Sequence, residues 1–141
     1  MNPRHARLAR YRAARERISP RTSLKAFEAL VAEALDELPD DVRARLENVA
    51  VLVEERARPG RHTDEPSQEL LGLYEGVNRV ERASGYHLVT PDRITLFWRP
   101  IIEEVGHGDL AAIRREVRKT VIHEVAHHFG MDDDELERLG A

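Results

Sequence analysis

An apolar segment near the C-terminal end limits most strongly what this chain can fold into, because ionisable side chains interrupt it at a helical spacing. Residues 121–129 are Val, Ile, Ala and Phe apart from His123, Glu124, His127 and His128. A helix this apolar is expected to be buried, and buried polar groups need partners. His123 and His127 are four residues apart, so they share one face of a helix and both imidazoles can bind the same ion.

The pattern His-Glu-x-x-His predicts a zinc site with a catalytic carboxylate beside it. Neutral imidazole nitrogens are good ligands for Zn²⁺, and a catalytic zinc usually has three protein ligands and one water. Glu124 directly follows His123, so it lies beside the metal but outside the ligand pair, where it can take a proton from a zinc-bound water. We therefore expect one Zn²⁺ per chain, with His123 and His127 as ligands and Glu124 as the general base.

The residues just downstream offer a third ligand. Gly130 stands three positions after His127 and Asp133 three positions after Gly130, which gives the spacing H-E-x-x-H-x-x-G-x-x-D. Gly130 is expected to end the helix with a positive φ, so that the chain turns back and Asp133 faces the ion. Asp134 is the alternative third ligand, because the turn could differ by one residue. Asp132 is expected to cap a last short helix.

Some aromatic and histidine side chains outside this pattern also bear on the site. His128 points about 100° away from the second ligand on a helix, so we expect it to pack around the site rather than bind the ion. Tyr74, Tyr86 and His107 are candidates for stabilising an oxyanion, although a structural role is the stronger expectation for each. His62 lies in a charged loop and is expected to be solvated.

The remaining patterns predict an α+β domain with about three strands. An apolar stripe after the N-cap Ser23 predicts a helix that ends before Pro39. Asp109 is expected to cap the long helix Leu110–Phe129, which begins in solvent and enters the core at its metal-binding end. The other expected elements are short helices at 41–46 and 101–105, strands at 49–53, 70–74 and 93–98, and loops at 54–68 and 77–90.

Three segments resemble the small bacterial zincin-like metallopeptidases, sometimes described as minimal zincins. They are Leu71-Gly-Leu-Tyr-Glu-Gly76, Pro91-Asp-Arg-Ile-Thr-Leu-Phe97 and the stretch from His123 to Leu136. The resemblance implies a compact zincin-like α+β domain, in which a small sheet packs with the long active-site helix and N-terminal helices. It also implies one zinc ion and an endopeptidase activity on an undefined peptide or protein substrate.

The pattern departs from that of larger zincins in ways that bear on function. Metzincins have His where Asp133 stands, and only eight residues follow Asp133 here, which leaves no room for a Met-turn or a lower subdomain. One wall of a normal peptide cleft is therefore expected to be missing or to come from elsewhere. Large zincins bind substrate as an added strand, and either Leu70–Tyr74 or Arg93–Trp98 offers that edge. Two functions remain open: a metallopeptidase of narrow specificity or low activity, or a catalytically weak or inactive zinc-stabilised binding domain.

Charge divides the chain into an extension, residues 1–22, and one domain, residues 23–141. Residues 1–23 contain seven Arg and one Glu, whereas the whole chain carries a net charge of −4. Such an arm can bind nucleic acid or an anionic membrane, although a plain solvated extension is the favoured interpretation. The sequence shows no apolar h-region of a signal peptide and no membrane span, and it contains no cysteine, so a cytoplasmic location is expected.

Overall fold

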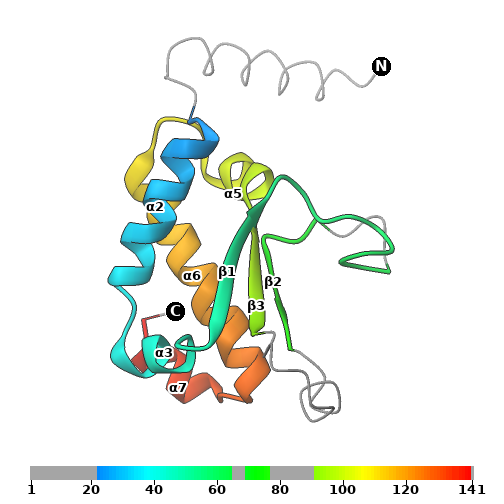
Figure 1. Cartoon of the computed structure of the whole chain (residues 1–141). Coiled ribbons are helices and arrows are strands. Elements are labelled where there is room, and N and C mark those ends of the chain that lie inside the picture. Colours follow the sequence, from blue (N-terminus) through cyan, green and yellow to red (C-terminus); the bar gives the residue numbers. More distant parts are fainter. Residues whose placement is uncertain (1–21, 65–68, 77–90, 141) are drawn as a thin grey trace, which may run out of the picture.

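The chain folds as a set of helices packed against one face of a small sheet (Figure 1). The computed structural model describes residues 22–64, 69–76 and 91–140. The predicted loop 77–90, Tyr86 and residues 1–21 of the predicted extension lie outside these ranges. In chain order, the described elements are α2 (Leu24–Asp36), α3 (Asp40–Arg45), β1 (Val49–Glu54), β2 (Gly72–Glu75), β3 (Asp92–Phe97), α5 (Trp98–Val105), α6 (Leu110–Phe129) and α7 (Asp133–Arg138).

The sheet has the strand order β1-β3-β2, with β1 parallel and β2 antiparallel to β3. This confirms the predicted α+β class and the three-stranded sheet. Because β3 lies in the middle and pairs on both sides, it has no free edge. The expectation that Arg93–Trp98 could offer an edge to a substrate strand is therefore wrong. Of the two strands predicted for that role, only the one that became β2 lies at an edge.

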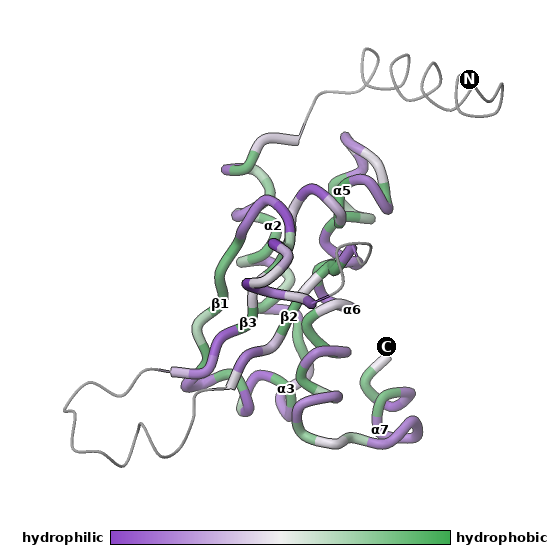
Figure 2. The backbone as a smooth tube through the Cα atoms, turned by 90° about the vertical axis from the view of Figure 1, so that its right-hand side faces the viewer, coloured by the Kyte–Doolittle hydropathy of each residue, from purple (hydrophilic) through white to green (hydrophobic). Residues whose placement is uncertain are grey.

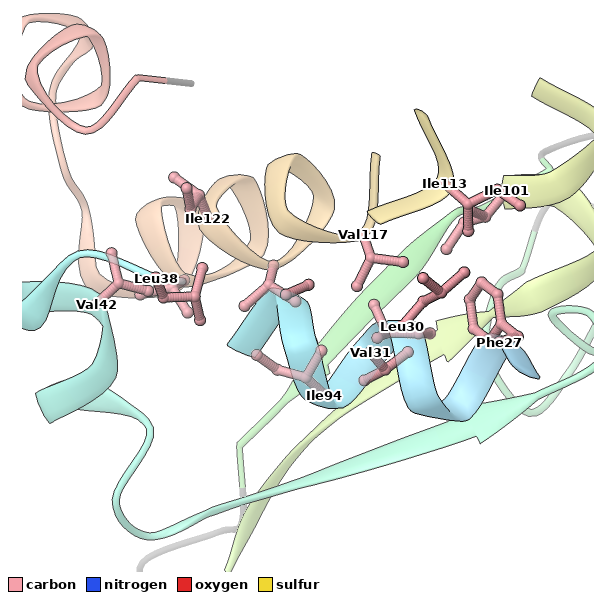
Figure 3. Close-up of a cluster of buried hydrophobic side chains, with 14 of the residues drawn as sticks. Phe27, Leu30, Val31, Leu38, Val42, Ile94, Ile101, Ile113, Val117 and Ile122 are labelled. Atoms are coloured by element: carbon pink, nitrogen blue, oxygen red, sulfur yellow. The ribbon is translucent and has the colours of Figure 1, made fainter. Parts of the chain in front are cut away.

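Helices α2 and α6 supply most of the core between them. Phe27, Leu30 and Val31 form the apolar stripe of α2 and are buried against Ile113 and Val117 of α6 (Figure 3). The N-terminal end of α2 forms as predicted, since the Ser23 side chain accepts a hydrogen bond from the backbone N–H of Ala26 at 3.1 Å. Sequence periodicity at three and four residues therefore predicted the face of α2 that packs against α6.

The two faces of β3 are covered by different parts of the chain. Ile94 and Leu96 belong to the core shared with the helices. Thr95 and Phe97 alternate with them, so they point to the opposite face, where both are still buried. On that face the His62 ring packs edge-on against Phe97, with 5.0 Å between ring centroids. The segment that follows β1 thus returns over the sheet.

His62 is held firmly in that segment, so the expectation that it is solvated is wrong. Its Nδ1 accepts a hydrogen bond from the backbone N–H of Arg58 at 2.9 Å, and its Nε2 lies 3.0 Å from a carboxylate oxygen of Glu54. The His62 side chain is only 1% exposed. A charged, proline-containing sequence predicted a loop correctly, but it did not reveal that the loop folds back onto the strand before it.

The observed ends of several elements differ from the predicted ones by one to three residues. The predicted turn at 101–105 is part of α5, which begins at Trp98 and includes Pro100. Proline is tolerated there because the first-turn N–H groups of a helix have no intrahelical partner.

α7 is mainly hydrophilic (Figure 2). Among the described residues, no helix is both long enough and apolar enough to cross a membrane.

Candidate active site

The long helix α6 has the predicted bounds, Leu110–Phe129. The Asp109 side chain caps its start by accepting a hydrogen bond from the N–H of Ala112 at 3.1 Å. Gly130 ends it with φ 65° in the left-handed region, and the N–H of Met131 then bonds to the carbonyl of Ala126 at 2.9 Å. The turn after the His-Glu-x-x-His motif is therefore fixed by the glycine that the sequence indicated.

The motif lies at the boundary between the core and the surface. Val125 and Ala126 are buried, His123 and Glu124 are half-buried, and His127 is exposed. Helical geometry places His123 and His127 on one face, as predicted from their spacing. Where the helix emerges from the core, the C-terminal part of α6 thus carries the paired imidazoles of His123 and His127 with the carboxylate of Glu124 beside them.

The carboxylate of Glu124 has a defined partner in the sheet. Its Oε2 accepts a hydrogen bond from the backbone N–H of Tyr74 in β2, with a donor–acceptor distance of 3.0 Å. The neighbouring hydrogen bond from the N–H of Phe97 to the carbonyl of Leu71, at 2.9 Å, shows which residues of this antiparallel pair face each other. Alternation along β2 then turns the N–H of Tyr74 away from β3, toward the edge of the sheet.

Two glycines let β2 approach α6 closely. A Cβ atom placed on Gly72 would lie 2.7 Å from Cγ2 of Thr120, which no side chain can accept without movement. A Cβ on Gly76 would lie 3.3 Å from Cε1 of His128, which is also tight. Absence of a side chain at these two positions therefore sets the distance between the strand and the helix.

Tyr74 is fixed between the helix and the central strand. Its ring stacks on His128 with centroids 3.9 Å apart and an interplanar angle of 20°. Its hydroxyl donates a hydrogen bond to Oδ2 of Asp92 at 2.8 Å. Phe129 contacts both rings edge-on, and the guanidinium of Arg45 lies 5.2 Å from the centroid of the Phe129 ring. His128 therefore packs in the surroundings of the site, in agreement with the expectation from its direction on the helix.

The neighbouring residue of β2 anchors the strand electrostatically. Glu75 forms ion pairs with Arg61 and Arg93, with N–O distances of 3.0 and 3.2 Å. Burial by itself raises the pKa of Glu75, but the hydrogen bonds from the two guanidinium groups outweigh it and lower the pKa. The side of β2 that bears Glu75 is thus tied to β3 and to the segment after β1.

The carboxylates after Gly130 are arranged by the short helix α7. Asp132 is its N-cap and accepts a hydrogen bond from the N–H of Glu135 at 2.8 Å, as predicted. Asp133 and Asp134 are exposed in the first turn. Within residues 22–64, 69–76 and 91–140, no three His, Asp or Glu side chains are grouped so that they could hold a metal ion. The structure therefore does not bring Asp133 together with the two predicted histidine ligands, and that ligand set stays a prediction.

The chemistry of the donors nevertheless fits zinc. The paired imidazoles and the carboxylates of the next turn are the nitrogen and oxygen ligands that Zn²⁺ accepts. Because the side chain of Asp132 already caps α7, it is the least suited of the three consecutive aspartates to be a ligand. His107, a candidate for stabilising an oxyanion, lies just before the start of α6, at the opposite end of the helix from Glu124. It accepts a hydrogen bond from the N–H of Thr22 at 3.3 Å. The hydroxyl of Tyr74, another candidate for stabilising an oxyanion, donates a hydrogen bond to Asp92.

Comparison with protein families supports the resemblance inferred from the sequence. A family model described as "zincin-like metallopeptidase" matches residues 46–141. A solved structure, a conserved hypothetical protein from Thermus thermophilus, is 26% identical, with a TM-score of 0.49. The similarity covers 77% of this chain and 94% of that protein. Among curated proteins, none matches the chain.

Proposed function

Because this chain belongs to the zincin-like metallopeptidase family, we propose that it is a zinc-dependent endopeptidase in which Glu124 is the general base. His123, His127 and Asp133 are the proposed ligands of one zinc ion. The observation that carries the proposal is the placement of Glu124. It is a half-buried carboxylate on an otherwise apolar stretch of α6, it adjoins the histidine pair, and it is held by the N–H of Tyr74.

Each group has a separate part in this chemistry. A zinc ion bound by these side chains would supply a Lewis acid that activates water and polarises a carbonyl group. Glu124 takes a proton and later transfers it to the leaving amine. Its Oε2 is engaged by Tyr74, so the proton is accepted at Oε1. Burial of a carboxylate is costly without a partner, and the hydrogen bond from β2 offsets part of that cost.

The sheet supports a narrow rather than a broad specificity. β2 is the edge strand nearest to Glu124, so it is the strand to which an extended substrate would add. One of its outward donors, the N–H of Tyr74, is already bonded to Glu124. A substrate strand therefore has fewer main-chain partners on β2 than on an empty edge. We expect a small set of substrates, chosen by contacts other than strand pairing.

The same observation favours the second candidate, a zinc-stabilised binding domain with weak or no catalysis. A strand edge that is partly used within the molecule is a poor platform for general proteolysis. In that case Glu124 would serve mainly to join α6 to β2. The two candidates differ in whether the zinc-loaded protein cleaves peptides and in whether that cleavage needs the carboxylate of Glu124.

The test is digestion of an unbiased peptide library by the zinc-loaded protein, with Glu124→Gln as the decisive variant. Gln keeps the size and a hydrogen-bonding end but accepts no proton, so kcat/KM should fall by roughly 10² or more. Zinc content and melting temperature should remain close to those of the wild type. Glu116→Gln, a matched change two turns earlier in α6, should leave cleavage unaltered.

Two results would overturn the proposal of peptidase activity. If Glu124→Gln cleaves at the wild-type rate, the base is another group or the activity belongs to a contaminant. If the zinc-loaded wild type cleaves no peptide in the library, the binding-domain function replaces the peptidase.

A further inference from the structure

Strand β2 and helix α6 run side by side with matching spacing. Two residues of a strand advance by about 6.6 Å and four residues of an α-helix by about 6 Å. The close approach of Gly72 to Thr120 and that of Gly76 to His128 lie at the two ends of this run. From one close approach to the other, the chain advances four residues from Gly72 to Gly76 and eight residues of α6 from Thr120 to His128.

Midway along this run, Tyr74 meets Glu124. The N–H of Tyr74 donates a hydrogen bond to the Glu124 carboxylate. This polar contact lies between the two places where a glycine closely approaches the helix. Because the spacings of the strand and the helix agree, all three contacts form together without distortion of either element. A shift of β2 along α6 would break all of them at once.

The side chain of Tyr74 keeps its own N–H in place. Stacking on His128 ties the ring to the helix that carries Glu124, one turn further on. The hydrogen bond from the hydroxyl to Asp92, at 2.8 Å, ties the same ring to the central strand. A backbone donor whose side chain is held at both ends has little freedom to move away from the carboxylate.

We propose that Tyr74 is the positioning residue for Glu124: its backbone N–H holds the carboxylate in the orientation needed for proton transfer, and the contacts of its ring with His128 and Asp92 hold that N–H. This inference rests on the proposed function of Glu124 as a base. It assigns to Tyr74 no contact with substrate and no proton of its own.

The first test reads the contact without any activity. Amide hydrogen exchange of Tyr74 should be roughly tenfold faster in Glu124→Ala than in the wild type, because the N–H loses its acceptor. Glu116→Ala, which removes a carboxylate elsewhere on α6, should leave that exchange rate unaltered. Equal exchange of Tyr74 in Glu124→Ala and wild type would refute the contact in solution, and with it the proposal.

The second test removes the N–H and leaves the side chain in place. Incorporation of the α-hydroxy acid of tyrosine at position 74 replaces the amide by an ester and keeps the ring, its stacking and its hydroxyl. We expect kcat for a cleaved peptide to fall roughly ten- to a hundredfold, because small misplacements of a catalytic group cost factors of this size. KM should change little. In the Glu124→Gln background the same ester should have less than about a twofold effect, since the group that it positions is gone.

A matched ester at Leu73 separates positioning from stability. The N–H of Leu73 faces β3, on the other side of the strand from Glu124. The ester at Leu73 should lower the melting temperature while kcat stays within about twofold of wild type. If the ester at Tyr74 lowers kcat no more than the ester at Leu73 does, Tyr74 has only a structural role and the proposal is wrong.

Failure of the proposed function gives a different result from failure of this inference. A wild type that cleaves no peptide removes the peptidase assignment and the catalytic part of the inference together. The exchange experiment then still decides whether Tyr74 holds Glu124. A wild type that cleaves peptides, with a Tyr74 ester that is equally active, leaves the peptidase intact and refutes the positioning role alone.

Discussion

Replacement of Gly72 by Ala should push β2 away from α6 and destabilise the protein. The added Cβ would lie 2.7 Å from Cγ2 of Thr120, and also 3.4 Å from the carbonyl oxygen of Thr95. Carbon atoms in favourable contact are about 3.5–4 Å apart, so the strand or the helix must move by close to one ångström. Such overpacking costs about 1–3 kcal/mol.

One effect of the substitution acts in the opposite direction. Alanine reduces the conformational entropy of the unfolded chain, which stabilises the fold by about 0.4–1 kcal/mol where the backbone conformation suits it. Gly72 lies in a strand and is not among the described glycines with positive φ, so this gain applies. The net loss in the free energy of unfolding should therefore be about 1–2 kcal/mol.

The loss can be measured by urea unfolding, and a second variant tests its cause. Thr120→Ser removes the Cγ2 atom that the new Cβ would meet but keeps the hydroxyl. By itself it should cost about 1 kcal/mol, the usual value for one buried methyl group. In the double variant, Gly72→Ala should cost far less than it does in the wild type. If the two losses simply add, the steric contact is not the reason for glycine at position 72, and the close approach of β2 to α6 is refuted.

Three further predictions concern the metal and the N-terminal extension. Asp133→Ala should reduce the zinc retained after dialysis far more than Asp132→Ala or Asp134→Ala; equal zinc losses in all three would undo the ligand assignment. Asp132→Ala should instead cost about 1 kcal/mol of stability, because it removes the cap of α7. A chelator should lower the melting temperature and added zinc should restore it, because zinc binds the native state; a melt unchanged after verified zinc removal would contradict this. Deletion of residues 1–21 should leave folding and zinc content intact. If these residues bind nucleic acid, the full chain should bind it with an affinity that falls steeply with salt; no binding by the full chain at low salt would exclude that role.

The elements whose ends are marked by local chemistry could be predicted from the sequence. The predicted bounds of α6 are the observed ones because Asp109 is a cap and Gly130 supplies a positive φ, and both signals act within a few residues. The β-branched and alternating patterns place strands β1 and β3 within one residue of their observed ends. The order of the strands could not be predicted in this way, because pairing joins residues that are distant in the sequence.

The partners of the candidate site could not be predicted for the same reason. A half-buried carboxylate such as Glu124 needs a partner, but no local pattern indicates that the partner is the N–H of Tyr74, fifty residues earlier. Charged neighbours predict a solvated His62, and only the fold shows that its ring covers Phe97. Asp92 stands out in the sequence only within a segment that resembles the family, yet it fixes the hydroxyl of Tyr74.

The composition of β2 shows how closely the site depends on the fold. A glycine within a strand costs about 0.5–1 kcal/mol relative to alanine, and this four-residue strand begins with Gly72 and is followed by Gly76. Intrinsic propensity therefore does not explain why β2 forms. Contacts with other parts of the chain explain it. Glu75 forms ion pairs with Arg61 and Arg93, and the hydroxyl of Tyr74 donates a hydrogen bond to Asp92. Since glycine at position 72 is also what allows α6 to approach, the feature that weakens β2 as a strand is the one that brings its backbone to Glu124.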